Sequence, residues 1–199
     1  MIDKRNVERR PIRPPSLTGK DYLAWEAEQE GRYEFIDGQV RLMAGGTRAH
    51  GLIAQNITLA LRTKLGRGPC FPMQEQKVAT PRGNYRYPDV TVDCGRTQAM
   101  RDLAADEPRV VFEVESPSNT TIDEVERLED FQSTPTVQQT VIVSQTKMRA
   151  RICTRAGAGW RAETLSGEEA ALDLSALECA LPFTEIYERV EFEPPAANA

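Results

Sequence analysis

The sequence contains one histidine and four cysteines in 199 residues. The cysteines lie far apart and form no Cys-x-x-Cys pair, so the ligand spacings of the usual Cys/His zinc sites are missing. We interpret all four cysteines as reduced thiols of a cytoplasmic protein. They are Cys70, Cys94, Cys153 and Cys179.

Long apolar runs are missing as well. No stretch approaches the roughly 18 residues that a membrane helix needs, so no membrane partner is expected. The segment 1–15 lacks the apolar core of a secretory signal, and its basic residues and prolines predict a flexible arm. We expect residues 16–190 to form a single domain and residues 191–199 to be a disordered tail.

Positive charge is not in excess, and lysine in particular is scarce. The net charge is −5, and the chain has five lysines against twenty arginines. An acidic balance argues against a broad, sequence-independent surface for nucleic acid, although a small basic groove remains compatible with it.

The hydrophobic pattern predicts one mixed α/β domain without internal repeats. The first helix is expected at 16–30, with Leu23, Trp25 and Ala27 near its buried side. A hairpin is expected at 32–43, around the Asp37-Gly38 pair that favours tight turns. Further helices are predicted at 49–65, 121–133 and 183–189, and further strands at 70–79, 86–94, 109–115, 138–145, 148–155 and 160–165.

Acidic residues are embedded in two of these strands. Side chains alternate along a strand, so Val111, Glu113 and Glu115 share one face of the strand at 110–115. Burying such a carboxylate without a partner would cost several kcal/mol. The sequence therefore predicts an arginine, solvent or a cation beside these two glutamates.

A third carboxylate, Asp89, follows Pro88 at the start of the strand at 86–94. If the two strands pair, Asp89 and Glu113 converge on one point. A small set of oxygen ligands with waters is how proteins usually hold Mg²⁺, especially next to phosphate. Ion pairs with some of the twenty arginines, or carboxylates at a solvated strand end, explain the same pattern without a metal.

The order of these acids resembles the PD-(D/E)XK nuclease superfamily: Glu34 in a hairpin, then Pro88-Asp89, then Glu113-Val114-Glu115. More specifically, the chain is similar to the bacterial Uma-type putative restriction endonuclease family, through "RYEFIDGQV", "MAGGTRAHGLIAQNITLALR", "YRYPDVTV", "VFEVESPSN" and "LPFTEIYERV". The resemblance covers about residues 16–190. It implies a restriction-endonuclease-like core, with a central mixed sheet flanked by helices.

The resemblance also implies a DNA endonuclease that depends on Mg²⁺, with Mn²⁺ as an alternative. Asp89 and Glu113 would be metal ligands together with the backbone carbonyl of Val114, and Glu34 would be a further acid, acting directly or through water. A homodimer fits this activity, because cutting both strands needs two sites. The alternatives are a degenerate relative that binds nucleic acid or a protein partner without cleaving, and a structural domain without metal.

The superfamily's third signature residue, a lysine, is absent. Its place holds Glu115, and the helix position from which relatives supply a lysine holds Arg127. Arg127 could stabilise charge on the phosphate but not accept a proton, and Glu115 could act as a base near a metal. The alternatives are a helix pair between Arg127 and Asp123, and an ion pair between Glu115 and an arginine.

Three further residues are candidates for contact with nucleic acid. His50 matches a recurrent histidine after the Gly-Gly loop in relatives, and Arg86 and Tyr87 stand next to the acids. A lone histidine at a helix start is more often a packing or capping residue. For Tyr87 the alternative is a half-buried strand aromatic.

Overall fold

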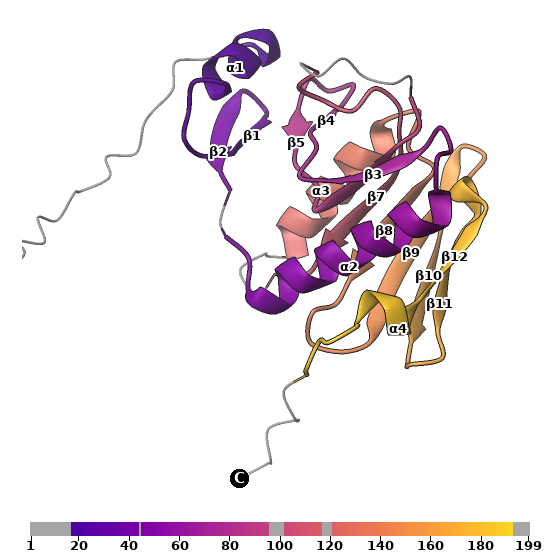
Figure 1. The fold of residues 1–199 in the computed structure, drawn as a ribbon. Coiled ribbons are helices and arrows are strands. Elements are labelled where there is room, and N and C mark those ends of the chain that lie inside the picture. Colours follow the sequence, from indigo (N-terminus) through magenta and orange to yellow (C-terminus); the bar gives the residue numbers. More distant parts are fainter. Residues whose placement is uncertain (1–16, 44, 96–101, 117–120, 193–199) are drawn as a thin grey trace, which may run out of the picture.

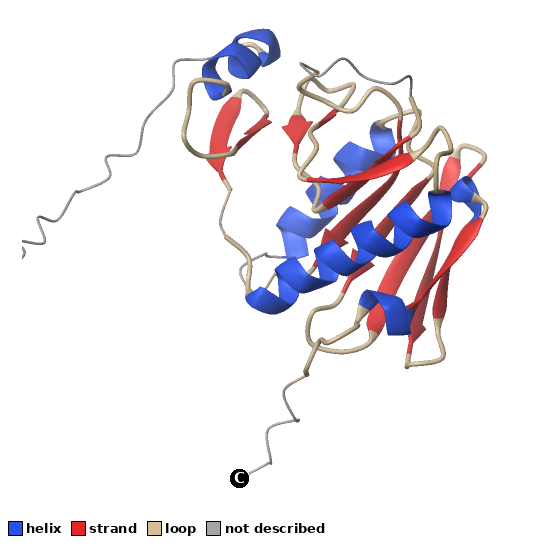
Figure 2. Ribbon diagram, in the orientation of Figure 1, coloured by secondary structure: helices blue, strands red, loops and turns tan. Residues whose placement is uncertain are grey.

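The computed structural model describes residues 17–43, 45–95, 102–116 and 121–192. The predicted arm at 1–15 and all but two residues of the predicted tail at 191–199 lie outside these ranges. The remaining chain forms a six-stranded sheet with helices on both faces, and a smaller sheet beside it (Figures 1 and 2). This confirms the predicted mixed fold with a central sheet flanked by helices.

The central sheet has the strand order β10-β9-β8-β7-β6-β3. All neighbouring strands are antiparallel except β7 and β8, which are parallel and are joined through helix α3. The sheet is therefore mixed, as predicted. Its strands are β3 (Phe71–Gln74), β6 (Val90–Asp93), β7 (Pro108–Val114), β8 (Gln139–Val143), β9 (Arg149–Ala156) and β10 (Gly159–Ser166), and the connecting helix is α3 (Thr121–Ser133).

The smaller sheet has the order β2-β1-β5-β4. Its first hairpin turns at Asp37 and Gly38, and both residues have positive φ, as the tight turn predicted there requires. Beside this sheet lies helix α1 (Gly19–Glu26), which begins at the N-cap Thr18. The strands are β1 (Tyr33–Ile36), β2 (Gln39–Leu42), β4 (Val78–Ala79) and β5 (Tyr85–Arg86).

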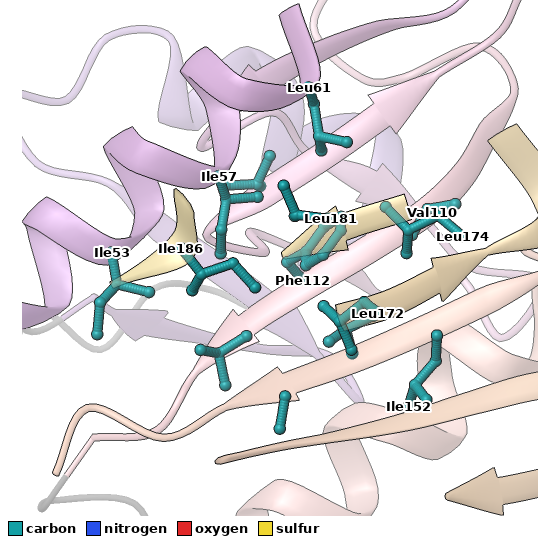
Figure 3. Packing of buried hydrophobic residues seen from close by; sticks show 14 of the residues in the cluster. Ile53, Ile57, Leu61, Val110, Phe112, Ile152, Leu172, Leu174, Leu181 and Ile186 are labelled. Carbon is teal, nitrogen blue, oxygen red and sulfur yellow. The ribbon is translucent and has the colours of Figure 1, made fainter. Parts of the chain in front are cut away.

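The main core lies between helix α2 (Arg48–Leu65) and the central sheet. Ile53, Ile57 and Leu61 follow the helical period and point into the cluster that contains Val110 and Phe112 of β7, with Ile53 beside Ile186 (Figure 3). Leucines from the hairpin at residues 171–182 complete this cluster. On the opposite face of the sheet, a smaller cluster packs around Phe131 of α3, so both faces of β7 are buried.

Five segments differ from the sequence-based expectation. The strands predicted at 70–79 and 86–94 each divide into two, because β3 and β6 belong to the central sheet and β4 and β5 to the smaller one. The first helix is shorter than 16–30, and its buried residues are Tyr22 and Glu26 rather than Leu23, Trp25 and Ala27. Helix α4 (Phe183–Ile186) is also shorter than predicted. The strands β11 (Ala171–Leu174) and β12 (Cys179–Pro182), with the 3₁₀ turn Ser175–Leu177 between them, were not expected. Leu172 and Leu174 alternate with exposed residues, which was the available signal for a strand.

The prediction that all four cysteines are reduced is wrong. Cys70 and Cys94 form a disulfide, while Cys153 and Cys179 are free. The register of β3 and β6 pairs Phe71 with Asp93, so the two cysteines just beyond these residues meet across the strands. Sequence separation conceals this proximity, and cysteine usage no longer supports the cytoplasmic assignment. Within the described ranges, no helix is long and apolar enough to cross a membrane.

Candidate active site

Strand β7 carries the first acid of the candidate site. The predicted alternation is confirmed, because Val110, Phe112 and Val114 face the α2 core while Val111 faces the α3 side. Glu113 therefore points toward α3. Strand β6 pairs with β7 through Val90 and Phe112, which brings Asp89 beside the end of β7 as predicted.

Asp89 is fixed by two donors that meet at the same oxygen. The backbone N–H of Val114 donates to Asp89 Oδ2 at 2.7 Å, and His50 Nε2 lies 3.2 Å from that atom. The hydrogen bond with Asp89 raises the pKa of His50, although burial acts in the opposite direction. His50 therefore has a specific partner at the site, and is neither a cap nor a packing residue alone.

The loop before α2 is shaped to admit this histidine. Thr47 caps the helix by accepting a hydrogen bond from the backbone N–H of His50 at 3.1 Å. A Cβ on Gly46 would lie 2.8 Å from His50 Nδ1, too close for any side chain. The glycine allows the imidazole to turn back toward Asp89.

Arg127 of α3 lies between two of the predicted acids. Its Nη1 and Nη2 atoms lie 2.9 and 3.2 Å from the two oxygens of Glu34, and Nη1 lies 3.3 Å from Glu113 Oε1. The Glu113 charge, followed by that of Glu34, raises the pKa of Arg127 against the effect of burial. The predicted alternative partner Asp123 lies outside the residues whose side chains are described. The structure thus brings Arg127 to the predicted acids.

Glu34 is joined to a second, deeper ion pair. Arg86 Nη1 lies 3.6 Å from Glu34 Oε2, and the Nε and Nη2 atoms of Arg86 each lie 2.7 Å from Asp130 Oδ2. Asn84 also donates to Asp130, at 3.1 and 3.2 Å to its two oxygens. A chain of charges therefore runs from Asp130 through Arg86 and Glu34, which are buried, to the half-buried Arg127, which contacts the carboxyl of Glu113.

Arg86 and Tyr87 have internal partners rather than free polar groups. Arg86 is buried between Asp130 and Glu34, and the Tyr87 hydroxyl donates to Glu26 at 2.8 Å. Glu26 also forms a buried ion pair with Lys77. Both predicted contact residues therefore serve the interior of the protein in this structure.

Glu115 has the arginine partner that one sequence alternative foresaw. Its Oε1 lies 2.9 Å from Nη2 of Arg149, and both side chains are partly exposed. Its backbone carbonyl accepts a hydrogen bond from Gln145, which is also bonded to Thr47 before α2. Glu115 is thus held apart from the Glu34–Arg127 pair, and its backbone helps to join β7 to α2.

Two cavities meet at Glu113 and Arg127. One has a volume of about 370 Å³ and is lined by Glu34, His50 and Asp89 among others. The other has a volume of about 330 Å³ and is lined by Glu115, Glu124, Leu128, Ile142 and Gln145 among others. Glu113, Val114, Ser116 and Arg127 line both cavities. All the predicted metal ligands line the first cavity.

A family comparison identifies the chain. A model of the Uma2 family, described as "Putative restriction endonuclease", matches residues 20–184. The chain belongs to the Uma2 family.

Two relatives and a solved structure are similar to this chain. An uncharacterized protein of Synechocystis sp., slr1290, is 30% identical over 138 residues, which cover 67% of this chain and 72% of the relative. A second Synechocystis protein, sll1609, is 24% identical over 80% of this chain and 93% of its own. A crystal structure from Anabaena variabilis, described as a putative nuclease belonging to DUF820, superposes with a TM-score of 0.69 at 13% identity. It covers 86% of this chain and 97% of that one, which shows the shared fold.

Burial raises the pKa of Glu113 to about 8, even though Arg127 acts to lower it. The nearby charges of Asp89 and Glu34 add to the increase. Around neutral pH this Uma2 protein therefore keeps a proton on Glu113 unless more positive charge arrives.

This pKa predicts a pH-dependent stability. The folded state binds the Glu113 proton more tightly than the unfolded state, whose pKa is about 4.5, so stability is lost as pH rises from about 4.5 to about 8. Glu113→Gln should match the parent near pH 4 and exceed its unfolding free energy at pH 9 by at least about 1.4 kcal/mol. Denaturant unfolding in a chelator measures this, with the exposed Glu163→Gln as control. An equal difference at both pH values would contradict the assignment.

Sequence reasoning missed Asp130 and the pairing role of Arg86. Asp130 lies three residues after Arg127 and one before the buried Phe131, so the α3 face that packs on the sheet carries both charges. An acid next to a core aromatic on the buried stripe was the available signal. Its partner on β5 could not be identified before the two sheets were placed together.

Proposed function

We propose that this Uma2 protein is a metal-dependent DNA endonuclease that hydrolyses phosphodiester bonds. The observation that carries the proposal is the convergence of Asp89 and Glu113, from paired strands β6 and β7, on one cavity that also holds Arg127. Membership of a family described as "Putative restriction endonuclease" supports it, as does the fold shared with a protein described as "a putative nuclease".

The donor set fits Mg²⁺ or Mn²⁺ in the manner of a phosphate-binding site. Within the described ranges, no group of three or more His, Cys, Asp or Glu residues could hold a metal. The ligands in this proposal are the carboxylates of Asp89 and Glu113 and the Val114 carbonyl, which line one cavity and lie beside His50. Mg²⁺ is usually held by one or two carboxylates, waters and substrate phosphates, which matches this set. Burial raises the pKa of Glu113, so positive charge added beside this carboxyl would favour its ionised form. When bound, Mg²⁺ supplies an activated water and stabilises charge on the phosphodiester.

The protein's own residues have separate roles in this proposal. His50 and the Val114 N–H orient Asp89 through Oδ2, and within the described residues Oδ1 has no hydrogen-bond donor. Arg127 offers a guanidinium beside the phosphate, where it offsets the negative charge that grows during hydrolysis. It cannot take a proton from water, because arginine stays protonated. Glu115 lines the neighbouring cavity and is engaged by Arg149, which makes Arg127 the stronger substitute for the missing lysine.

The test is a cleavage assay on supercoiled plasmid and on single-stranded DNA. We expect cleavage with Mg²⁺ or Mn²⁺, none with a chelator, and a loss of at least about a hundredfold in Glu113→Gln, with the exposed Glu163→Gln as its control. A homodimer would give linear plasmid, whereas a single site would give nicks. Equal cleavage by parent and Glu113→Gln would reject the site.

One observation favours the alternative of a relative that binds nucleic acid or a protein without cleaving it. Arg127 already contacts Glu34 and Glu113, so part of the acidic charge is neutralised by the protein itself. Under this alternative, calorimetry with Mg²⁺ in the presence of DNA shows no metal binding, and the assay shows DNA retention without products.

A further inference from the structure

The geometry points to Glu34 as a positioning residue that holds Arg127, rather than as a metal ligand. This inference rests on the proposed function for the role of Arg127 at the phosphate. It departs from the expectation that Glu34 would reach the metal directly or through water. Its basis is the difference between the contacts that the Arg127 guanidinium makes with Glu34 and with Glu113.

Glu34 binds Arg127 through two parallel contacts. Nη1 pairs with Oε1 at 2.9 Å and Nη2 with Oε2 at 3.2 Å, the forked arrangement that fixes both distance and orientation. Among the residues that the structure describes, Glu113 receives one contact, at 3.3 Å and from the nitrogen that already serves Glu34. The orientation of Arg127 is therefore set by Glu34.

Both oxygens of Glu34 have several protein partners. Oε1 also accepts the backbone N–H of Tyr87 at 3.0 Å, and Oε2 also faces Arg86 at 3.6 Å. The Glu34 side chain is only 6% exposed, against 14% for Glu113 and 17% for Asp89. A metal at Glu34 would have to displace buried cations, whereas Glu113, among the described residues, has a single shared contact to give up.

Asp130 and Arg86 keep Glu34 in place from behind. Asp130 fixes Arg86 through two contacts of 2.7 Å, and Arg86 then faces Glu34. Arg127 and Asp130 lie on the same helix, so α3 is attached to the small sheet at two points, through Arg86 and through Glu34. When Glu113 changes partner, Arg127 stays in position because Glu34 still holds it.

The first experiment is a cycle of metal affinities measured by calorimetry with Mn²⁺. We expect Arg127→Gln to bind about tenfold more tightly and Glu34→Gln to bind more weakly, because each changes the local charge. The double variant restores that charge and should bind within about threefold of the parent. A double variant that remains tenfold or more weaker than the parent would show that Glu34 donates an oxygen to the metal, and would overturn the inference.

The second experiment needs neither metal nor activity. In the parent, ¹⁵N NMR should show signals from slowed rotation of the Arg127 guanidinium. These signals are assigned to Arg127 by their disappearance in Arg127→Lys. We expect the slowed signals to vanish in Glu34→Gln and to survive in Glu113→Gln, the matched control at the other contact. Survival in Glu34→Gln, or loss in Glu113→Gln, would overturn the inference.

Two controls separate the possible failures. Glu34→Asp keeps the charge but places the carboxylate farther from Arg127, so the slowed signals should vanish in this variant too. If thermal unfolding shows that Glu34→Gln is unfolded, Glu34→Asp takes its place in the experiment. If the parent binds no Mn²⁺ even with DNA, the proposed function fails, and the NMR result alone decides whether Glu34 holds Arg127.

Discussion

Replacing Asp89 by asparagine should lower metal-dependent DNA cleavage by about a thousandfold or more and abolish metal binding, with little change in the fold. A loss of this size corresponds to about 4 kcal/mol of transition-state stabilisation, which is within the range of a metal site. Asparagine keeps an oxygen that can accept the Val114 N–H, so the end of β7 retains its hydrogen bond. Cleavage of plasmid and calorimetry with Mg²⁺ measure the two effects.

The matched control for this variant is Asp173→Asn. Asp173 is an exposed aspartate on β11, remote from the candidate site, so its replacement should leave both measurements unchanged. An Asp89→Asn protein that cleaves DNA as fast as the parent would remove Asp89 from the metal site. A variant that loses both activity and its thermal transition would show that Asp89 is needed for folding instead.

Replacing Asp130 by alanine should destabilise the protein by about 3–5 kcal/mol, because Arg86 would be left buried without its partner. The two side chains are 2% and 4% exposed, so water cannot compensate the guanidinium. For a chain of this size the melting temperature should fall by about 10 °C. Denaturant and thermal unfolding measure both quantities.

The neighbouring Glu129 provides a control on the same helix. Its side chain is exposed, so Glu129→Ala should change the unfolding free energy by less than about 0.5 kcal/mol. A similarly small effect of Asp130→Ala would mean that Arg86 finds another carboxylate, and that the chain of charges through Glu34 does not depend on Asp130.

Much of the candidate site was predictable because it depends on local rules. The alternation along β7 predicted that Glu113 faces away from the main core. Pro88 predicted that a strand begins next to Asp89. The Asp37-Gly38 turn placed Glu34 on a hairpin strand. The partners of these acids followed no local rule. Arg127 is 93 residues from Glu34 in sequence, so their contact depends on how α3 packs against the small sheet.

Other features depended on pairings that short-range patterns do not encode. The disulfide of Cys70 with Cys94 follows from the register of β3 against β6. The strands β11 and β12 are only four residues long each, so the alternation of Leu172 and Leu174 is a short signal. The first helix buries Glu26 because that carboxylate meets Lys77 and Tyr87, two residues from another part of the chain.

The sequence by itself determined the mixed fold, the order of the acids and the absence of a lysine at the position of Glu115 or Arg127. Only the tertiary structure decided which cation meets which carboxylate, with Arg127 on Glu34, His50 on Asp89 and Arg149 on Glu115. The physical reason is that alternation and periodicity fix which face a side chain takes. The charge that it meets on that face depends on how distant elements pack.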